Sequence, residues 1–128
     1  MIVVDTHVLV WWTNNNRDQL SQNARRALVD ADSVAFSVIS AWEVRTLSAR
    51  SRINVAPGPS EWLRVVTETY SLTPLPVTLE ISLLAAELQN VLRDPIDCLI
   101  AATALTHGVP LVTKDERIQR SGVVATIW

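Results

Sequence analysis

The chain has 128 residues, of which 48% are apolar and 19% charged, with a mean hydropathy of +0.21 and a net charge of −2. This length fits one domain, residues 1–128, and the composition excludes intrinsically disordered proteins. No apolar run approaches the ~18 residues of a membrane-spanning helix, and the charge balance excludes an overall basic field. Cys98 has no disulfide partner in the chain, and residues 1–5 lack the basic start of a secretory signal. We therefore expect one soluble, cytoplasmic domain.

Strands and helices alternate in the first half of the chain. Short β-branched or apolar runs predict buried strands at residues 2–4 and 34–36. Apolar spacing and N-cap residues predict helices at residues 8–12, 21–31 and 40–50. The third helix begins with Ser40-Ala41-Trp42-Glu43, which matches the capping box.

The alternation continues in the second half. Pro57-Gly58-Pro59 interrupts the chain, and a helix is expected from Ser60 with Trp62, Val65, Val66 and Thr69 at helical spacing. Residues 72–77 contain two prolines, which allows an edge strand at most. A further helix to about Leu92 is indicated by the spacing of Leu79, Leu83, Ala86 and Leu88. Asp94-Pro95 opens a helix that ends at Gly108, and strands follow at 111–113 and 124–127, separated by a charged turn.

This alternation predicts an α/β fold. We expect a three-layer sandwich around a mostly parallel sheet of four to five strands, with helices on both faces. Ligands of open parallel sheets bind at the carboxyl ends of the strands.

Four acidic residues are expected at that edge. Asp5 ends the first strand, Glu43 lies in the first turn after the second strand, and Asp115 follows the strand at 111–113. The helix that Gly108 closes runs down to the start of that strand, so its first turn, with Asp97, lies at the same edge. Four carboxylates close together repel one another, and a divalent cation relieves the repulsion. Such a cluster is suited to metal-assisted phosphodiester hydrolysis.

Each acid also has a structural interpretation, except one. Glu43 can complete the capping box, Asp97 is favoured by the helix dipole, and Asp115 can lie in a solvated turn. Asp94 is explained by its role as N-cap. No propensity places Asp5 at the end of a buried strand, so the convergence of all four acids carries the functional hypothesis.

Four motifs occur in order: Asp5-Thr6-His7, Ser40-Ala41-Trp42-Glu43, Asp97-Cys98-Leu99-Ile100-Ala101-Ala102-Thr103-Ala104 and Leu111-Val112-Thr113-Lys114-Asp115. With the ending Val124-Ala125-Thr126-Ile127-Trp128, they resemble the PIN-domain nucleases, specifically the VapC-type toxins of toxin–antitoxin pairs, over essentially the whole chain. The resemblance implies a Mg²⁺-dependent endoribonuclease whose acidic residues are Asp5, Glu43, Asp97 and Asp115. Leu92 and Cys98 depart from the histidine and basic residue that many relatives carry, which bears on substrate contacts.

The resemblance and the chemistry together assign roles. Asp5 and Asp97 are expected to hold Mg²⁺, for which Mn²⁺ is a substitute, while Glu43 and Asp115 complete the coordination or orient the attacking water. Thr6, Thr113 and Arg45 are candidate substrate contacts, and Arg50 and Arg52 lie in the same segment as Arg45. His7 is left without an assigned role.

Five tryptophans are many for a small core and indicate interfaces. Trp11 and Trp12 are adjacent, so on a helix they point about 100° apart and do not easily face one interior. We expect a homodimer that also binds a cognate antitoxin through a groove lined by Trp11, Trp12 or Trp42. An arginine of this partner would pair with the carboxylates and compete with the metal.

Two other functions are consistent with an α/β domain of this length. A phosphoacceptor receiver domain requires a pair of acids after the first strand and an aspartate ending a central strand, and the chain has Asp5-Thr6 and a proline-containing segment there. A non-catalytic binding module of the same fold would retain the acids for structural reasons only.

Overall fold

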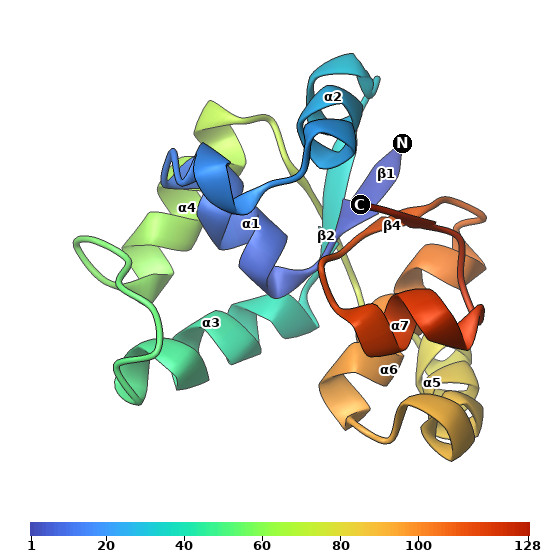
Figure 1. The fold of residues 1–128 in the computed structure, drawn as a ribbon. Coiled ribbons are helices and arrows are strands. Elements are labelled where there is room, and N and C mark those ends of the chain that lie inside the picture. Colours follow the sequence, from blue (N-terminus) through green and yellow to red (C-terminus); the bar gives the residue numbers. More distant parts are fainter.

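The computed structural model describes all 128 residues. Five strands form one sheet in the order β3-β2-β1-β4-β5, and every neighbouring pair is parallel (Figure 1). The strands are β1 (Ile2–Val4), β2 (Val34–Ser37), β3 (Thr73–Leu75), β4 (Leu111–Val112) and β5 (Thr126–Ile127). The predicted α/β class and parallel sheet are confirmed, and the proline-containing β3 is an edge strand as expected.

Seven α-helices connect the strands: α1 (Thr6–Thr13), α2 (Gln22–Asp30), α3 (Ile39–Ala49), α4 (Pro59–Thr69), α5 (Leu79–Leu92), α6 (Pro95–Thr106) and α7 (Glu116–Ser121). Side-chain oxygens of Ser21, Thr78 and Asp94 accept hydrogen bonds from backbone N–H groups in the first turns of α2, α5 and α6. These caps satisfy donors that have no partner within the helix. None of the helices combines the length and the apolar composition needed to cross a membrane.

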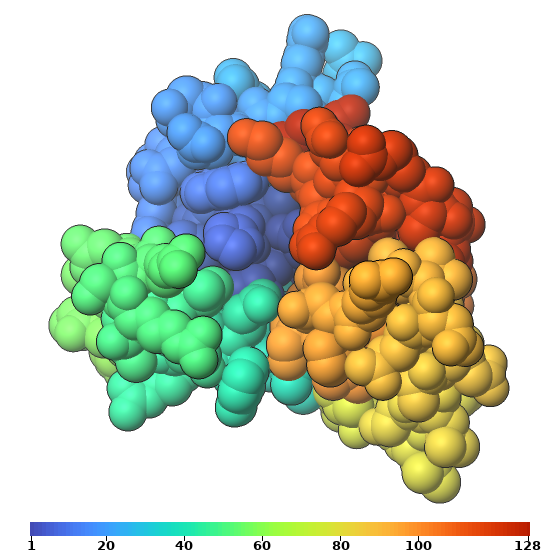
Figure 2. Space-filling model, turned by 60° about the horizontal axis from the view of Figure 1, so that its bottom comes forward, coloured from blue at the N-terminus to red at the C-terminus, as the bar shows by residue number.

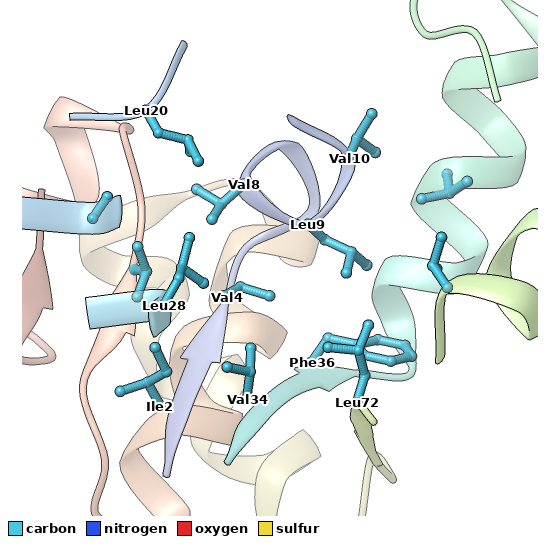
Figure 3. Close-up of a cluster of buried hydrophobic side chains, with 14 of the residues drawn as sticks. Ile2, Val4, Val8, Leu9, Val10, Leu20, Leu28, Val34, Phe36 and Leu72 are labelled. Carbon is cyan, nitrogen blue, oxygen red and sulfur yellow. The ribbon is translucent and has the colours of Figure 1, made fainter. Parts of the chain in front are cut away.

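Two apolar clusters cover the two faces of the sheet. Successive strand residues point to opposite faces, so Ile2 and Val4 belong to one cluster and Val3 to the other. The first cluster receives side chains from α1 to α4 and is shown around Val4 and Leu9 in Figure 3. The second receives side chains from α5, α6 and α7, including the buried Cys98. Figure 1 shows the same division of helices on either side of the sheet, which makes three layers.

The strand order reverses direction at β1. Strands β2 and β3 lie on one side of β1, whereas β4 and β5 lie on the other. In open parallel sheets, ligands bind in the crevice beyond the carboxyl ends of the strands at such a switch point. Val4 pairs with Val112, and the Asp5 N–H donates to the Val112 carbonyl at 3.1 Å. Asp5 and Thr113 therefore meet at the point where the topology favours a binding site.

The predicted capping box at Ser40 is wrong. Helix α3 begins at Ile39 after Val38, and the buried Ser40 hydroxyl accepts a hydrogen bond from Thr6 Oγ1 at 2.9 Å. This tertiary contact between α1 and α3 uses the oxygen that a cap would require. Glu43 is consequently not part of a cap.

Three local predictions also need correction. The predicted charged turn after Thr113 contains helix α7, with Asp115 as its N-cap. On α5, Leu79 and Leu83 are exposed and the buried stripe contains Ile81 instead. Helix α4 starts at Pro59, one residue before the predicted Ser60, and its Val65 and Thr69 face outward. The α5 and α4 stripes were misplaced because the apolar spacing allows more than one face.

Candidate active site

A pocket of about 440 Å³ opens at the carboxyl edge of β1 and β4. In Figure 2 the dark blue N-terminal residues lie at the bottom of a hollow whose walls come from the teal-to-green α3 region, the orange α6 and the red α7 region. Its lining contains the five carboxylates of Asp5, Glu43, Asp94, Asp97 and Asp115 and the basic side chains of Lys114 and Arg117. The other lining residues are Thr6, His7, Trp11 and Ile100. The structure thus brings the four predicted acids together, and adds Asp94.

Asp5 is fixed at the bottom of the pocket by two structural roles. It ends β1 and is the N-cap of α1, where its Oδ1 accepts the Val8 N–H at 2.8 Å. Burial raises the pKa of its carboxyl, and hydrogen bonds from Thr113 and from the Val8 backbone act in the opposite direction. Its position at the strand end therefore combines a cap with a carboxylate that faces the pocket.

Asp97 is held in the first turn of α6 by the cap that precedes it. The Asp94 carboxylate accepts the N–H groups of Ile96 and Asp97 at 2.9 and 3.0 Å. Burial raises the pKa of Asp97 to about 7, and the negative charges of Asp94, Asp115 and Glu43 contribute in the same direction. Asp97 therefore combines partial burial with the negative charges of three neighbouring carboxylates.

Glu43 has no hydrogen-bond or ion-pair partner in the structure. It projects from α3 into the pocket lining and is partly exposed. The Thr6–Ser40 hydrogen bond holds the start of α3 against α1, which places Glu43 in the lining with Asp5. Its carboxylate is free to accept a ligand or a water.

Asp115 has the opposite electrostatic surroundings. As N-cap of α7 it accepts the N–H groups of Arg117 and Ile118 at 2.8 and 3.2 Å through Oδ1. Its Oδ2 pairs with Arg117 Nη2 at 2.9 Å, and this arginine keeps the pKa of Asp115 below its usual value. Arg117 also lies 3.6 Å from Asp97 Oδ2. The sequence pattern did not assign a role to Arg117. Recognition of helix α7 would have placed Arg117 two residues after the N-cap Asp115 and so beside its carboxylate.

The donor set fits a hard divalent cation. All five acidic residues of the lining offer oxygen atoms, which Mg²⁺ and Mn²⁺ prefer. Repulsion between Asp97 and the neighbouring carboxylates favours a cation there. As the side chains stand, no three acidic, histidine or cysteine groups are arranged as ligands of one ion, and Arg117 is shared by Asp97 and Asp115. A cation therefore requires these side chains to reorient, Arg117 first.

The three predicted substrate contacts lie in different surroundings. Thr6 and Thr113 are fully buried, with hydroxyls bonded to Ser40 and to the Asp115 N–H respectively. Both therefore support the positions of acidic residues. Arg45 is exposed on α3 and is not part of the pocket lining.

The three predicted interface tryptophans do not share one surface. Trp11 lines the acidic pocket. Trp12 packs edge-on against Tyr70, with ring centroids 5.0 Å apart. Trp42 lies on α3 and is 57% exposed. Of the three, Trp42 has the most exposed side chain and is the most available to a partner, and the groove itself stays a prediction.

Comparison with known proteins identifies relatives. The sequence profile of the PIN domain matches residues 2–123. Ribonuclease VapC22 of Mycobacterium tuberculosis is 34% identical over 132 aligned residues, which cover 99% of this chain and 98% of the relative. The residues matched by the profile span the segment from Asp5 to Asp115.

Solved structures with this fold include two toxin–antitoxin complexes. VapBC2 from Rickettsia felis, bound to a DNA fragment from its promoter, contains a chain with a TM-score of 0.70 at 20% identity, covering 98% of this chain and 97% of that chain. DNA-bound VapBC from Salmonella typhimurium gives a TM-score of 0.69 at 19% identity, covering 98% and 95%. At these identities the likeness establishes the fold.

Proposed function

Because this chain belongs to the PIN-domain family, we propose that it is a Mg²⁺-dependent endoribonuclease and the toxin of a toxin–antitoxin pair. The relative at 34% identity is a ribonuclease, which supports RNA as the substrate. The structural neighbours are complexes of a toxin with its antitoxin, which supports the biological setting. Family membership argues against the receiver-domain alternative.

The observation that carries the proposal is the accumulation of uncompensated carboxylates at the switch point of the sheet. Five acidic groups line one pocket, and their charges, added to burial, raise the pKa of Asp97 to about 7. Such an arrangement destabilises the folded protein, because like charges at close range disfavour their ionised forms. It is therefore expected only where a function requires it. Hydrolysis of a phosphodiester bond with a divalent cation is a function of that kind.

We assign the metal to Asp5 and Asp97, which come from two different elements, the end of β1 and the first turn of α6. When bound there, Mg²⁺ would neutralise charge on the phosphate and lower the pKa of a water molecule. Asp115 completes the site once Arg117 turns away. Thr113 donates to Asp5 and accepts the Asp115 N–H, so it holds these two acids in register.

Glu43 is the residue best suited to orient the attacking water. Its carboxylate has no other partner, and a general base needs a free oxygen within hydrogen-bond reach of the water. The contact between Thr6 and Ser40 fixes the start of α3, from which Glu43 projects. Thr6 thereby acts as a positioning residue.

The experiment that tests the function uses purified protein freed from any partner. We expect it to fragment total RNA in the presence of Mg²⁺, with no fragments in excess EDTA. Asp97→Asn serves as the matched protein control. If the fragmentation pattern of the unchanged protein equals that of Asp97→Asn, the non-catalytic binding module is the better description.

The proposed antitoxin would inhibit by placing an arginine among the carboxylates. The pairing of Arg117 with Asp115 and Asp97 supports this idea, because this corner of the pocket already accommodates a guanidinium. We propose that the partner also contacts Trp42, which is exposed on α3. Trp11 and Trp12 are further candidate contacts. Loss of inhibition on Trp42→Ala, with RNA cleavage intact, would support that contact.

The proposed homodimer is supported by exposed apolar side chains on α5. On α5, Leu79, Leu83 and Val91 are 77, 61 and 56% exposed. Exposed leucines and valines grouped on one helix are typical of a protein interface. Light scattering of the isolated protein tests this part, and a strictly monomeric species contradicts it. We place the protein in the cytoplasm, where an RNA substrate is available.

A further inference from the structure

One wall of the acidic pocket is aromatic and basic. Trp11 lies with its ring centroid 5.6 Å from that of His7 and 6.4 Å from that of Trp128. The Lys114 amino group lies 5.5 Å from the Trp11 centroid, over the ring. His7, Trp11 and Lys114 all belong to the lining that contains the carboxylates. The proposed hydrolysis does not use any of these groups.

The fold holds this wall in place from several directions. His7 and Trp11 are four residues apart on α1, so they share a helix face that begins directly after Asp5. Lys114 follows β4 and Trp128 follows β5, and both strands end at the same edge as β1. Trp11 and Trp128 also pack against the first apolar cluster, and Asn23 Nδ2 donates to the Trp128 carbonyl at 3.3 Å. The ring of Trp11 is therefore fixed before any ligand arrives.

The two cations of the pocket are used differently. Arg117 is paired with Asp115 and Asp97, whereas Lys114 forms no ion pair and rests over an aromatic ring. A cation–π contact made by an exposed lysine is weak, so the Lys114 amino group can leave the half-buried Trp11 ring for a phosphate. Lys114 is thus the cation of the pocket that is available to a ligand.

An acidic pocket on a chain with net charge −2 repels a polyanion. The side chains of the pocket therefore supply no net electrostatic attraction for RNA, so contacts other than charge add to what a bound cation and Lys114 provide. Stacking of a base on an aromatic ring is such an interaction, and it tolerates any sequence because every base has a π-face. Trp11 offers such a ring beside Asp5 and the other acids.

We propose that Trp11 is the stacking surface for an unpaired base next to the scissile phosphate, with Lys114 moving from the ring to a backbone phosphate. This inference rests on the proposed ribonuclease function. Such stacking needs a base that is not stacked on its neighbours, which a nucleotide in a loop, bulge or single strand provides.

The test combines variants of Trp11 with substrates that lack one base. Trp11→Leu keeps an apolar side chain without the π-face, and Trp11→Phe keeps a ring. We expect Trp11→Leu to raise KM about tenfold with little change in kcat, and Trp11→Phe to restore most of the loss. Tyr70→Leu is the matched control, because Tyr70 is a half-buried aromatic residue that packs against Trp12 outside the pocket. It should leave KM unchanged.

A substrate series with one abasic nucleotide at each position around the cut does not depend on the stability of a variant. One position should raise KM for the unchanged protein about as much as Trp11→Leu does, and should have no further effect in Trp11→Leu. If the abasic nucleotide and Trp11→Leu raise KM independently and additively, Trp11 is not the stacking surface. An unaltered KM in Trp11→Leu has the same meaning, and in both cases the RNA cleavage activity itself is unaffected. A Trp11→Leu variant that cleaves normally and loses only inhibition by the antitoxin also overturns the stacking surface. Absence of cleavage by the unchanged protein overturns the ribonuclease function itself.

Discussion

Asp97 in the first turn of α6 and Asp115 at the N-cap of α7 line the same pocket and behave in opposite ways. Their side chains have similar exposed fractions, 23% and 26%, yet burial raises the pKa of Asp97 and is outweighed at Asp115. The pKa of Asp97 is raised to about 7, whereas that of Asp115 is lowered. Asp115 accepts two backbone N–H groups and pairs closely with Arg117, while Asp97 faces three other carboxylates. Burial and neighbouring carboxylates thus raise the pKa of Asp97, whereas hydrogen bonds from Arg117 and the backbone outweigh burial at Asp115.

The largest effect is expected from removing the charge of Asp97. Asp97→Asn keeps the side-chain volume and should lower the cleavage rate at least about 100-fold, by analogy with the loss of a group that stabilises transition-state charge. Asp94→Asn is the matched control, since asparagine caps a helix as well as aspartate and removes one charge from the same pocket. We expect it to retain most of the cleavage rate. An equal loss of cleavage rate in both variants would contradict the assignment of Asp94 as a helix cap and of Asp97 as a metal ligand.

The raised pKa of Asp97 predicts how stability depends on pH in the metal-free protein. In the folded state the pKa of Asp97 is about 7, whereas in the unfolded chain its carboxyl releases the proton near the usual aspartate pKa of 3.8. Between these values the folded state binds more protons, so the free energy of unfolding falls as the pH rises and levels off above pH 7. The melting temperature of Asp97→Asn should match that of the unchanged protein near pH 4 and exceed it at pH 7.5. A constant difference across this range contradicts the raised pKa.

A smaller effect is expected from Arg117. This side chain is 67% exposed, and its pairs with Asp115 and Asp97 compete with a cation for the same oxygens. Ion pairs of exposed side chains are weak, so Arg117→Gln should tighten Mg²⁺ binding only a few-fold. Arg120→Gln is the control, because Arg120 lies on the same helix and pairs with Glu116 outside the pocket. Titration calorimetry with Mg²⁺ measures both, and weaker binding in Arg117→Gln would show that the arginine assists the cation.

Much of the scaffold could be predicted because its signals are local. Asp94-Pro95 identifies the start of α6, and the short apolar run at residues 2–4 identifies β1, so Asp5 and Asp97 could be placed at the same edge from the sequence. Glu43 and Asp115 were predicted at that edge in the same way, because they follow predicted strands, and the resemblance to a family then added their role in metal binding.

The failures occurred where a tertiary contact replaces a local one. Ser40 matches a capping box, yet its hydroxyl bonds to Thr6, which is 34 residues away in the sequence. Helix α7 has six residues, mostly polar, and its buried Ile118 alone does not generate a periodic pattern. The interface prediction for Trp11 stays a prediction, but its place in the pocket lining could not be foreseen, because Lys114 and Trp128 reach its ring from distant parts of the sequence.

The most direct test of the central claim, that one carboxylate pocket both binds the cation and cuts RNA, is a Mg²⁺ titration of the partner-free protein with two readouts. The cleavage rate and the melting temperature should rise over the same range of Mg²⁺ concentration, because an ion that binds the folded state stabilises it. Asp97→Asn should lose both responses, and Ca²⁺ should raise the melting temperature while supporting little cleavage. Full cleavage in excess EDTA, or an undiminished rate in Asp97→Asn at saturating Mg²⁺, would contradict the account.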